Sequence, residues 1–356
     1  MTKDATIHHS ETVTPLYPPS WVDRFTDWVK RLPGPSWLFY LGLWLALFLL
    51  INALKWLDGS QPLGTIEPLL ALGAALAIYF PAMMHYLNGA ASTALRTFRP
   101  VLAVSEAEYK RLHYQLTTLP ARGAWLASGI GITMTVLYML FRPTAMPDYI
   151  TSLPVAVLDL GFFICALTTL GALIYHTIHQ LTTVSRIHAA ATHINLFQLD
   201  PLYAFSGLAA RTVLGYILIV DTTFLFIREV MSEEANDPEV IGVLTLIVLL
   251  AVVTFVLPLL GMHRRMVEEK ARLEAEANHR LEAAIAELHR RVDDAEFNDM
   301  TELYRAIAGL EIERDVLARI STWPWQPGTL RIMISPVLLP VAVWLIQRLL
   351  ERFAGW

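Results

Sequence analysis

The sequence predicts an all-α, polytopic membrane protein with seven transmembrane helices. A helix needs roughly 20 apolar residues to cross the hydrocarbon of a bilayer, and seven separate stretches of the chain meet or nearly meet that length. The chain is also 55% hydrophobic and only 17% charged, whereas an ordinary soluble domain is roughly a quarter charged. The seven stretches are 36–57, 64–88, 124–141, 152–178, 203–228, 238–262 and 329–350.

The basic residues predict how the chain is oriented. Lysine and arginine gather before the first stretch and after the second, fourth and sixth, while the opposite connections are acidic or carry few basic residues. Cytoplasmic loops carry an excess of Lys and Arg, so the N-terminus is predicted to be cytoplasmic and the C-terminus outside, in a cell membrane. Arg348 and Arg352 in the C-terminal tail run against this pattern.

Residues 1–35 are predicted to form a disordered tail followed by an amphipathic helix. Ser20 and Asp23 have the spacing of a capping box, in which two side chains bind backbone N–H groups at a helix start. Apolar residues then follow at helical spacing: Trp21, Phe25, Trp28, Val29 and Leu32. Such a helix either lies in the cytoplasmic interface of the membrane or packs on the cytoplasmic face of the protein itself. The six-helix region 36–262 follows it.

The segment 263–322 is the most highly charged part of the chain. By direct count, 24 of the 59 charged side chains lie between residues 263 and 320. Apolar residues recur there every three or four positions in two runs: Met266, Leu273, Ala277, Leu281, Ile285, Leu288 and Val292, then Met300, Leu303, Ile307, Leu310, Leu317 and Ile320. Residues 293–299 between the runs favour a turn, so the pattern predicts a cytoplasmic antiparallel helical hairpin. Its narrow apolar stripes pack within one chain, or they form a coiled coil between subunits.

Residues 323–356 are predicted to hold the seventh transmembrane helix and a tail. Trp323 and Trp325 lie next to prolines and indicate re-entry through the cytoplasmic interface, where tryptophan is enriched. Proline inside a helix frees a backbone carbonyl, and protein or water must satisfy that carbonyl in a membrane. The seventh helix is therefore predicted to face inward and line a pore, with these candidate residues: Ser335, Pro336, Pro340 and Gln347.

Two carboxylates, Asp159 and Asp221, lie well inside predicted spans, in the half nearer the outside. Burying an ionisable group in that position costs free energy, and such a group usually faces a water-filled cavity or a partner. The functional interpretation is an outer vestibule that concentrates cations, or an ion or proton relay. The structural alternative is a capped or paired carboxylate near the headgroups.

His85, His176 and His179 lie at the cytoplasmic ends of the second and fourth spans. His176 and His179 share a helix face, and this spacing occurs in metal sites. A pH-responsive cluster and ordinary interfacial histidines are the alternatives, and the last is favoured. We therefore expect no resident metal and no cofactor.

Enzyme signatures are absent from the sequence. It contains no HExxH, GxSxG or Walker A motif, so we expect a protein that is not an enzyme. A net charge of −5 gives no reason to expect nucleic acid as a partner. The lipid bilayer is the predicted partner, together with a possible cytosolic protein at 263–320.

In the seventh span, five apolar residues, 342–346, precede Gln347. With the overall layout, this resembles the seven-transmembrane ion channels typified by insect odorant and gustatory receptors. That family has Thr-Tyr where Pro340-Val341 stand here, and Phe where this chain has Arg348. The resemblance implies a homo-oligomer, a tetramer, anchored by the cytoplasmic helices, with the seventh span lining the pore.

Three function classes follow. The leading one is an oligomeric, cation-leaning ion channel or channel-like sensor, with the seventh helix lining the path. The second is a secondary transporter that uses the intramembrane carboxylates. The third is a non-conducting membrane scaffold or sensor that displays the hairpin 263–320.

Overall fold

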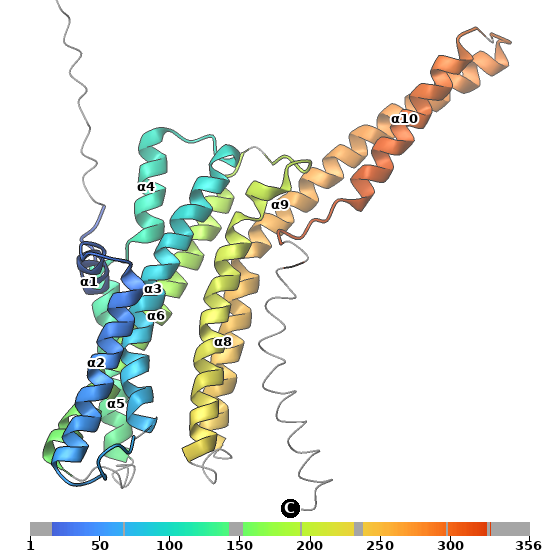
Figure 1. The fold of residues 1–356 in the computed structure, drawn as a ribbon. Helices are drawn as coiled ribbons and strands as arrows, with labels where there is room; N and C mark the ends of the chain where they lie inside the picture. Colours follow the sequence, from blue (N-terminus) through green and yellow to red (C-terminus); the bar gives the residue numbers. More distant parts are fainter. Residues whose placement is uncertain are drawn as a thin grey trace, which may run out of the picture. The chain divides into compact units, whose positions relative to one another are not determined.

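A computed structural model of the chain describes residues 16–66, 68–141, 152–192, 194–230, 238–296, 298–325 and 328 (Figure 1). Within these ranges the chain is all-helical, as predicted. Only two isolated β-bridges occur there, Pro19 with Pro120 and Leu102 with Ala191, and no strand forms in the described part. The predicted seventh span lies outside the described residues, with its candidates Ser335, Pro336, Pro340 and Gln347.

The helices appear in the following order. They are α1 (Trp21–Lys30), α2 (Ser36–Leu57), α3 (Pro68–Phe98), the 3-10 turn η1 (Arg99–Val101), α4 (Glu106–Thr117), α5 (Ala121–Phe141), α6 (Leu153–Ala189), α7 (Leu199–Leu202), α8 (Ala204–Val230), α9 (Pro238–Asp293) and α10 (Met300–Arg319).

Five described segments are long and apolar enough to cross a membrane, which suggests a membrane-embedded protein. They are Ser36–Leu57, Ala121–Phe141, Leu153–Ala189, Leu199–Thr223 and Leu249–Asp293. The predicted second span forms the first part of α3, but α3 is not among the five in its described residues. The five are drawn only from residues whose side chains are described, and those of Pro68, Leu69 and Leu70 at the start of α3 are not.

The apolar helices keep large hydrophobic side chains on their outer faces. On α5, for example, Leu126 is 72% exposed and Ile130 is 63% exposed. A monomeric soluble protein rarely exposes a continuous apolar face of this kind. Contact with lipid chains accounts for it.

The chain forms two compact units, and each is described by itself. The first unit comprises Met1–Thr93, Val104–Thr183 and Gly215–Val248. The second unit comprises Ala94–Ala103, Val184–Leu214 and Leu249–Trp356.

In the first unit, the N-terminal segment and α1 are fastened to the turn between α4 and α5. Asp23 Oδ2 accepts hydrogen bonds from Ser20 N at 3.0 Å, Ser20 Oγ at 2.7 Å and Leu119 N at 2.9 Å. The predicted capping box at Ser20 is therefore present. Burial raises the pKa of the Asp23 carboxyl, although these hydrogen bonds act to lower it.

The buried face of α1 differs from the predicted stripe. Val22, Thr26 and Val29 are almost fully buried, whereas Trp28 is 49% exposed. Helix α1 contacts α2 and α5, and Trp21 Nε1 donates to Ser128 Oγ at 3.1 Å. The helix therefore packs on the first unit through its smaller side chains.

Helices α5 and α6 cross at short range, and two glycines permit this approach. A Cβ atom at Gly131 would lie 2.8 Å from the carbonyl carbon of Leu167. A Cβ atom at Gly171 would lie 3.1 Å from the carbonyl carbon of Ala127. Small residues four apart are a common device for close packing of membrane helices, and Ala127 and Gly131 form such a pair on α5.

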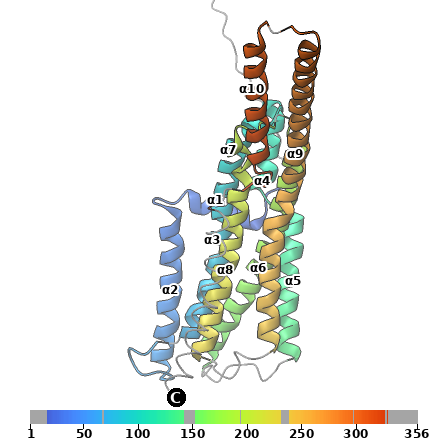
Figure 2. The same ribbon diagram turned by 90° about the vertical axis from the view of Figure 1, so that its right-hand side faces the viewer.

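In the second unit, α10 lies alongside the end of α9 in both views (Figures 1 and 2). At the C-terminal end of α10, the carbonyl oxygens of Ala318 and Ile320 accept hydrogen bonds from Lys270 Nζ of α9, at 2.8 Å and 3.0 Å. Further along, Arg280 Nη1 lies 3.6 Å from Glu313 Oε1. We refer to residues 263–319 as the arm.

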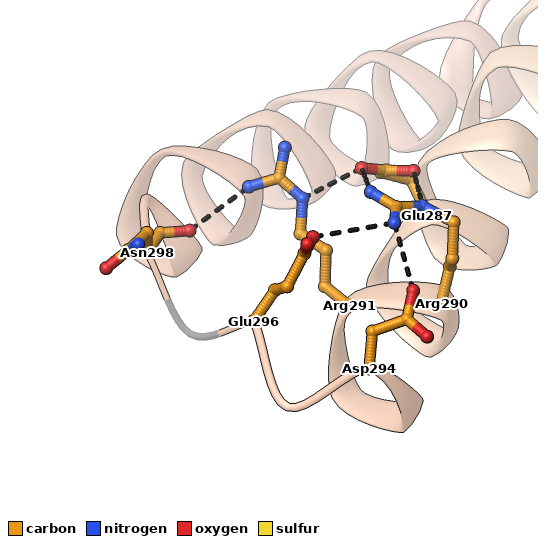
Figure 3. A network of polar contacts seen from close by, with 6 residues as sticks. All are labelled: Glu287, Arg290, Arg291, Asp294, Glu296 and Asn298. Atoms are coloured by element: carbon orange, nitrogen blue, oxygen red, sulfur yellow. Dashed lines mark hydrogen bonds and ion pairs between the residues drawn. The ribbon is translucent and has the colours of Figure 1, made fainter.

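The turn between α9 and α10 is held by a network of charged side chains (Figure 3). Glu287 accepts hydrogen bonds from both Arg290 and Arg291, at 2.8 to 2.9 Å. Arg290 also reaches Asp294 at 3.1 Å, and Arg291 reaches the carbonyl oxygen of Asn298 at 3.2 Å. These groups are largely exposed to solvent, so each pair stabilises the turn only slightly.

A column of aromatic rings fixes the chain that follows α10. His263 Nδ1 donates to the carbonyl oxygen of Thr322 at 2.9 Å, and its ring stacks on Trp323 with centroids 4.0 Å apart. Trp323 stacks on Trp325 at 4.4 Å, and Trp325 stacks on Phe255 at 5.6 Å. The segment therefore runs back along α9.

Candidate site on the inner face of α6

The inner face of α6 carries a line of buried polar side chains. Buried or partly buried residues recur there every three or four positions: Val155, Asp159, Phe162, Ala166, Thr169, Leu173, His176, Gln180 and Thr183. Thr169 and Thr183 donate to carbonyl oxygens of their own helix. His176 and Gln180 have no such partner on their own helix, so their side chains can form hydrogen bonds with other groups on this face.

His176 is held in one orientation by α3. Its Nε2 lies 2.8 Å from Asn88 Oδ1, and an amide oxygen only accepts hydrogen bonds. Nε2 therefore carries the proton, and Nδ1 of the neutral ring is an acceptor. Nδ1 is buried and has no hydrogen-bond partner among the described residues.

Gln180 follows His176 by one helical turn, and its side chain is 3% exposed. Its Nε2 amide group is also buried without a partner in the described part of the chain. Beside this pair, Thr177 Oγ1 and the Tyr216 hydroxyl on α8 lie 2.8 Å apart. The Tyr79 hydroxyl on α3 donates to the carbonyl oxygen of Gly215 at 3.0 Å. The cluster thus joins α3, α6 and α8 through uncharged groups.

His179 lies at the end of α6 nearest α4 and makes different contacts from His176. Its Nε2 is 2.9 Å from the carbonyl oxygen of Gln115 and 3.5 Å from the Tyr17 hydroxyl. Tyr17 in turn donates to the carbonyl oxygen of Thr118 at 2.8 Å. The N-terminal segment therefore covers this end of the α6 face.

The three predicted histidines do not form one site. His85 Nδ1 lies 3.0 Å from the Tyr40 hydroxyl on α2, so each histidine has its own hydrogen-bond partner. Among the described residues, no group of three or more His, Cys, Asp or Glu is placed to hold a metal ion. Nothing in the described part of the chain supports the metal alternative.

The two predicted carboxylates lie on different helices. Asp159 is partly buried on the inner face of α6, near enough to the buried Lys55 of α2 for the two charges to attract. Asp221 is partly exposed on α8, and neither carboxylate acts electrostatically on the other. The attraction to Lys55 is compatible with the structural alternative at Asp159, and among the described residues no charged group acts in this way on Asp221.

Asn88, Gln180, Thr177 and Tyr216 were not among the residues that the sequence singled out. A search for ionisable groups inside apolar stretches passes over them, since amides and hydroxyls occur in many membrane helices. The signal was the spacing. Thr169, His176, Gln180 and Thr183 lie on one face of an otherwise apolar helix.

The second unit has a surface hollow of about 870 Å³ between the end of α6 and α9. It is lined by Ala191, Thr192, Ile194, Asn195, Arg265, Glu268, Glu269 and Arg272. Arg265 donates to the carbonyl oxygens of Ala189 and Ala191, and Arg272 pairs with Glu269. Both arginines of the hollow therefore already have oxygen partners.

Comparisons with protein-family models, with curated proteins and with solved structures gave no match.

Proposed function

We propose that this is a membrane transport protein in which a small polar solute or ion passes along the inner face of α6. The observation that carries the proposal is the unused hydrogen-bonding capacity of His176 and Gln180, both buried in an apolar bundle. Polar groups between membrane helices either join the helices or mark a route for solutes. A group that only joins helices is expected to be satisfied, because leaving it unpaired costs about 1–3 kcal/mol.

The test is flux through the purified protein in liposomes, with Gln180→Leu and His176→Leu compared with the natural sequence. Each change removes polar atoms from the route, and we expect permeation to fall at least about tenfold, which corresponds to about 1.4 kcal/mol. Flux of K⁺, of protons and of small neutral solutes is measured in parallel.

Ile178→Leu is the matched control for these variants. Ile178 lies on the same turn of α6 but is 49% exposed on the outer face, so flux should not change. Folding of all three variants is checked by size-exclusion chromatography. Folded Gln180→Leu and His176→Leu proteins with undiminished flux of every solute would refute the route.

A second candidate is the oligomeric, cation-leaning channel lined by residues 329–350. The arm favours it, because both helices expose apolar side chains that do not face each other. These are Ile285 and Val292 on α9, and Tyr304, Ile312 and Val316 on α10, between 37% and 72% exposed. A cytoplasmic arm of this kind, about 45 Å long at 1.5 Å per residue, would hold subunits together or bind a cytosolic partner.

Ile312→Asp combined with Val316→Asp tests the assembly. A tetramer held by the arm should become monomeric in native mass spectrometry, whereas Glu311→Gln on the same helix should leave it intact.

Electrical recording separates the function classes. Discrete cation-selective currents that change in the Asp159→Asn, Asp221→Asn double variant would favour the channel. A monomer that still transports would favour the single-chain route. A folded protein without flux would favour the third function class, a non-conducting scaffold or sensor.

A further inference from the structure

Two unsatisfied atoms of complementary character lie one turn apart on α6. His176 Nδ1 is a hydrogen-bond acceptor, because Nε2 carries the ring proton and donates to Asn88 Oδ1. Gln180 Nε2 is a hydrogen-bond donor. Both atoms are buried without a partner among the described residues, so one needs a donor and the other an acceptor.

The spacing of the two side chains suits a single bridging molecule. Residues four apart on a helix have Cβ atoms about 5–6 Å apart and lie on the same face. A molecule that accepts from Gln180 and donates to His176, with each heavy-atom distance near 2.9 Å, satisfies both groups at once. Buried waters typically fill this role in proteins, and they need two to four polar partners.

The surrounding groups favour a neutral occupant. Three uncharged polar residues belong to the same cluster as His176 and Gln180. They are Asn88 on α3, Thr177 on α6 and Tyr216 on α8. Among the described residues, the ionisable group that acts on His176 is His179, which lies beside the N-terminal segment. An ion without a counter-charge would pay a large desolvation penalty here.

We infer that His176 and Gln180 together bind one small neutral molecule that both donates and accepts a hydrogen bond, namely water or ammonia. Identifying that molecule as a permeant rests on the proposed function. The binding site itself is a separate claim with its own measurement.

The experiment is solid-state nuclear magnetic resonance of the full chain in lipid bilayers, with ¹⁵N-labelled histidine and glutamine. His176→Phe serves only to assign the His176 signals. We expect a neutral ring protonated at Nε2, with Nδ1 hydrogen-bonded and in through-space contact with an exchangeable water proton. Gln180→Leu should shift the Nδ1 resonance, because the bridging molecule loses its second partner.

Ammonia is separated from water by adding ¹⁵N-ammonium at alkaline pH. A correlation between Nδ1 and the added nitrogen would assign ammonia, and persistence of the water contact would assign water. A direct correlation between Nδ1 and the Gln180 amide nitrogen, or an Nδ1 signal free of any hydrogen bond, would overturn the inference. Because the natural sequence supplies these readouts, failure of a variant to fold does not affect them.

The binding site and the transport route fail in distinguishable ways. If water is bound at Nδ1 but Gln180→Leu does not change flux, the site stands and the proposed function fails. If Gln180→Leu lowers flux but Nδ1 has no bound molecule, the proposed function stands and the inference is wrong.

Discussion

Gly131→Leu and Gly171→Leu should each abolish the folded protein in detergent. At either position the first side-chain atom would overlap backbone atoms of the facing helix, Leu167 for Gly131 and Ala127 for Gly171. Backbone cannot rotate away as a flexible side chain does, so α5 and α6 would have to separate. We expect a loss of at least about 4 kcal/mol, at the extreme end of single substitutions.

The matched control is Gly129→Leu, two residues away on α5. A Cβ atom there meets nothing within 4 Å, and the position is exposed. Size-exclusion chromatography and thermal unfolding in detergent should show a folded Gly129→Leu protein and aggregated Gly131→Leu and Gly171→Leu proteins. Equal stability of the three variants would show that α5 and α6 do not cross at these glycines.

Asp23→Ala should destabilise the protein by about 3 kcal/mol. The substitution removes the acceptor of Leu119 N–H, and an unpaired buried donor costs about 1–3 kcal/mol. It also removes the capping box of α1, worth about 1 kcal/mol. Tryptophan fluorescence during heating should report a melting temperature lower by about 5 °C or more.

Asp27→Ala is the control for this prediction, since Asp27 lies one turn later on α1. Its ion pair with Lys30, at 2.8 Å, is more than half exposed, and such surface pairs contribute less than about 1 kcal/mol. A loss of stability in Asp27→Ala equal to that in Asp23→Ala would contradict a specific role for the Asp23 contacts.

Because the pKa of the Asp23 carboxyl is raised, the folding stability should depend on pH in a defined direction. Burial raises the Asp23 pKa above its ordinary value of 3.8, so the folded protein binds more protons than the unfolded chain between those two values. The proton-linked part of the Asp23 contribution to stability is fully present below 3.8 and is lost as pH rises through the raised pKa, whereas the hydrogen bonds to the carboxylate persist. Asp23→Asn should remove this component, and parallel pH profiles for the two proteins would refute it.

Local patterns in the sequence predicted local structure well. The Ser20–Asp23 capping box is present, and α9 ends at Asp293 within the predicted turn 293–299. The bond from Leu119 N to the same Asp23 carboxylate was not predictable. It joins residues 96 positions apart, and no periodicity in the sequence reports on such a contact.

The buried face of α1 could be predicted only in part, because apolar spacing does not say whether a face meets the membrane or the protein. The predicted stripe, which includes Trp28 and Val29, left both contacts open, and the structure buries Val29 together with Val22. Close packing of α1 on its neighbours favours small side chains, while indole and phenyl rings lie comfortably at a membrane surface.

The α9 stripe also drifts around the helix. Met266, Ala277 and Leu281 are buried, whereas Ile285 is 37% exposed and Val292 is 49% exposed. At 3.6 residues per turn, Ile285 lies about 100° from Met266. A run that looks continuous in sequence therefore covers two faces of α9, one buried and one partly exposed.

For the candidate site, the sequence indicated His176 because it shares a helix face with His179, a spacing that occurs in metal sites. It could not indicate Asn88, since that contact depends on how α3 packs against α6. The attraction between Asp159 and Lys55 was likewise hidden. Asp159 lies on α6 and Lys55 on α2, and the sequence alone does not show that these two helices are neighbours.

Side-chain contacts at both ends hold the chain after α10 against α9. Phe255 and Lys270 are 15 residues apart on α9, a rise of about 22 Å. Ile320 and Trp325, which meet those two residues, are joined by five residues that span at most about 17 Å when extended. The long side chains of Lys270, Trp325 and Phe255 span the difference, so the segment is not fully extended and bends at residues 323–325. The return of the chain along α9 is therefore fixed by side-chain contacts at its two ends and not by the length of the backbone between them.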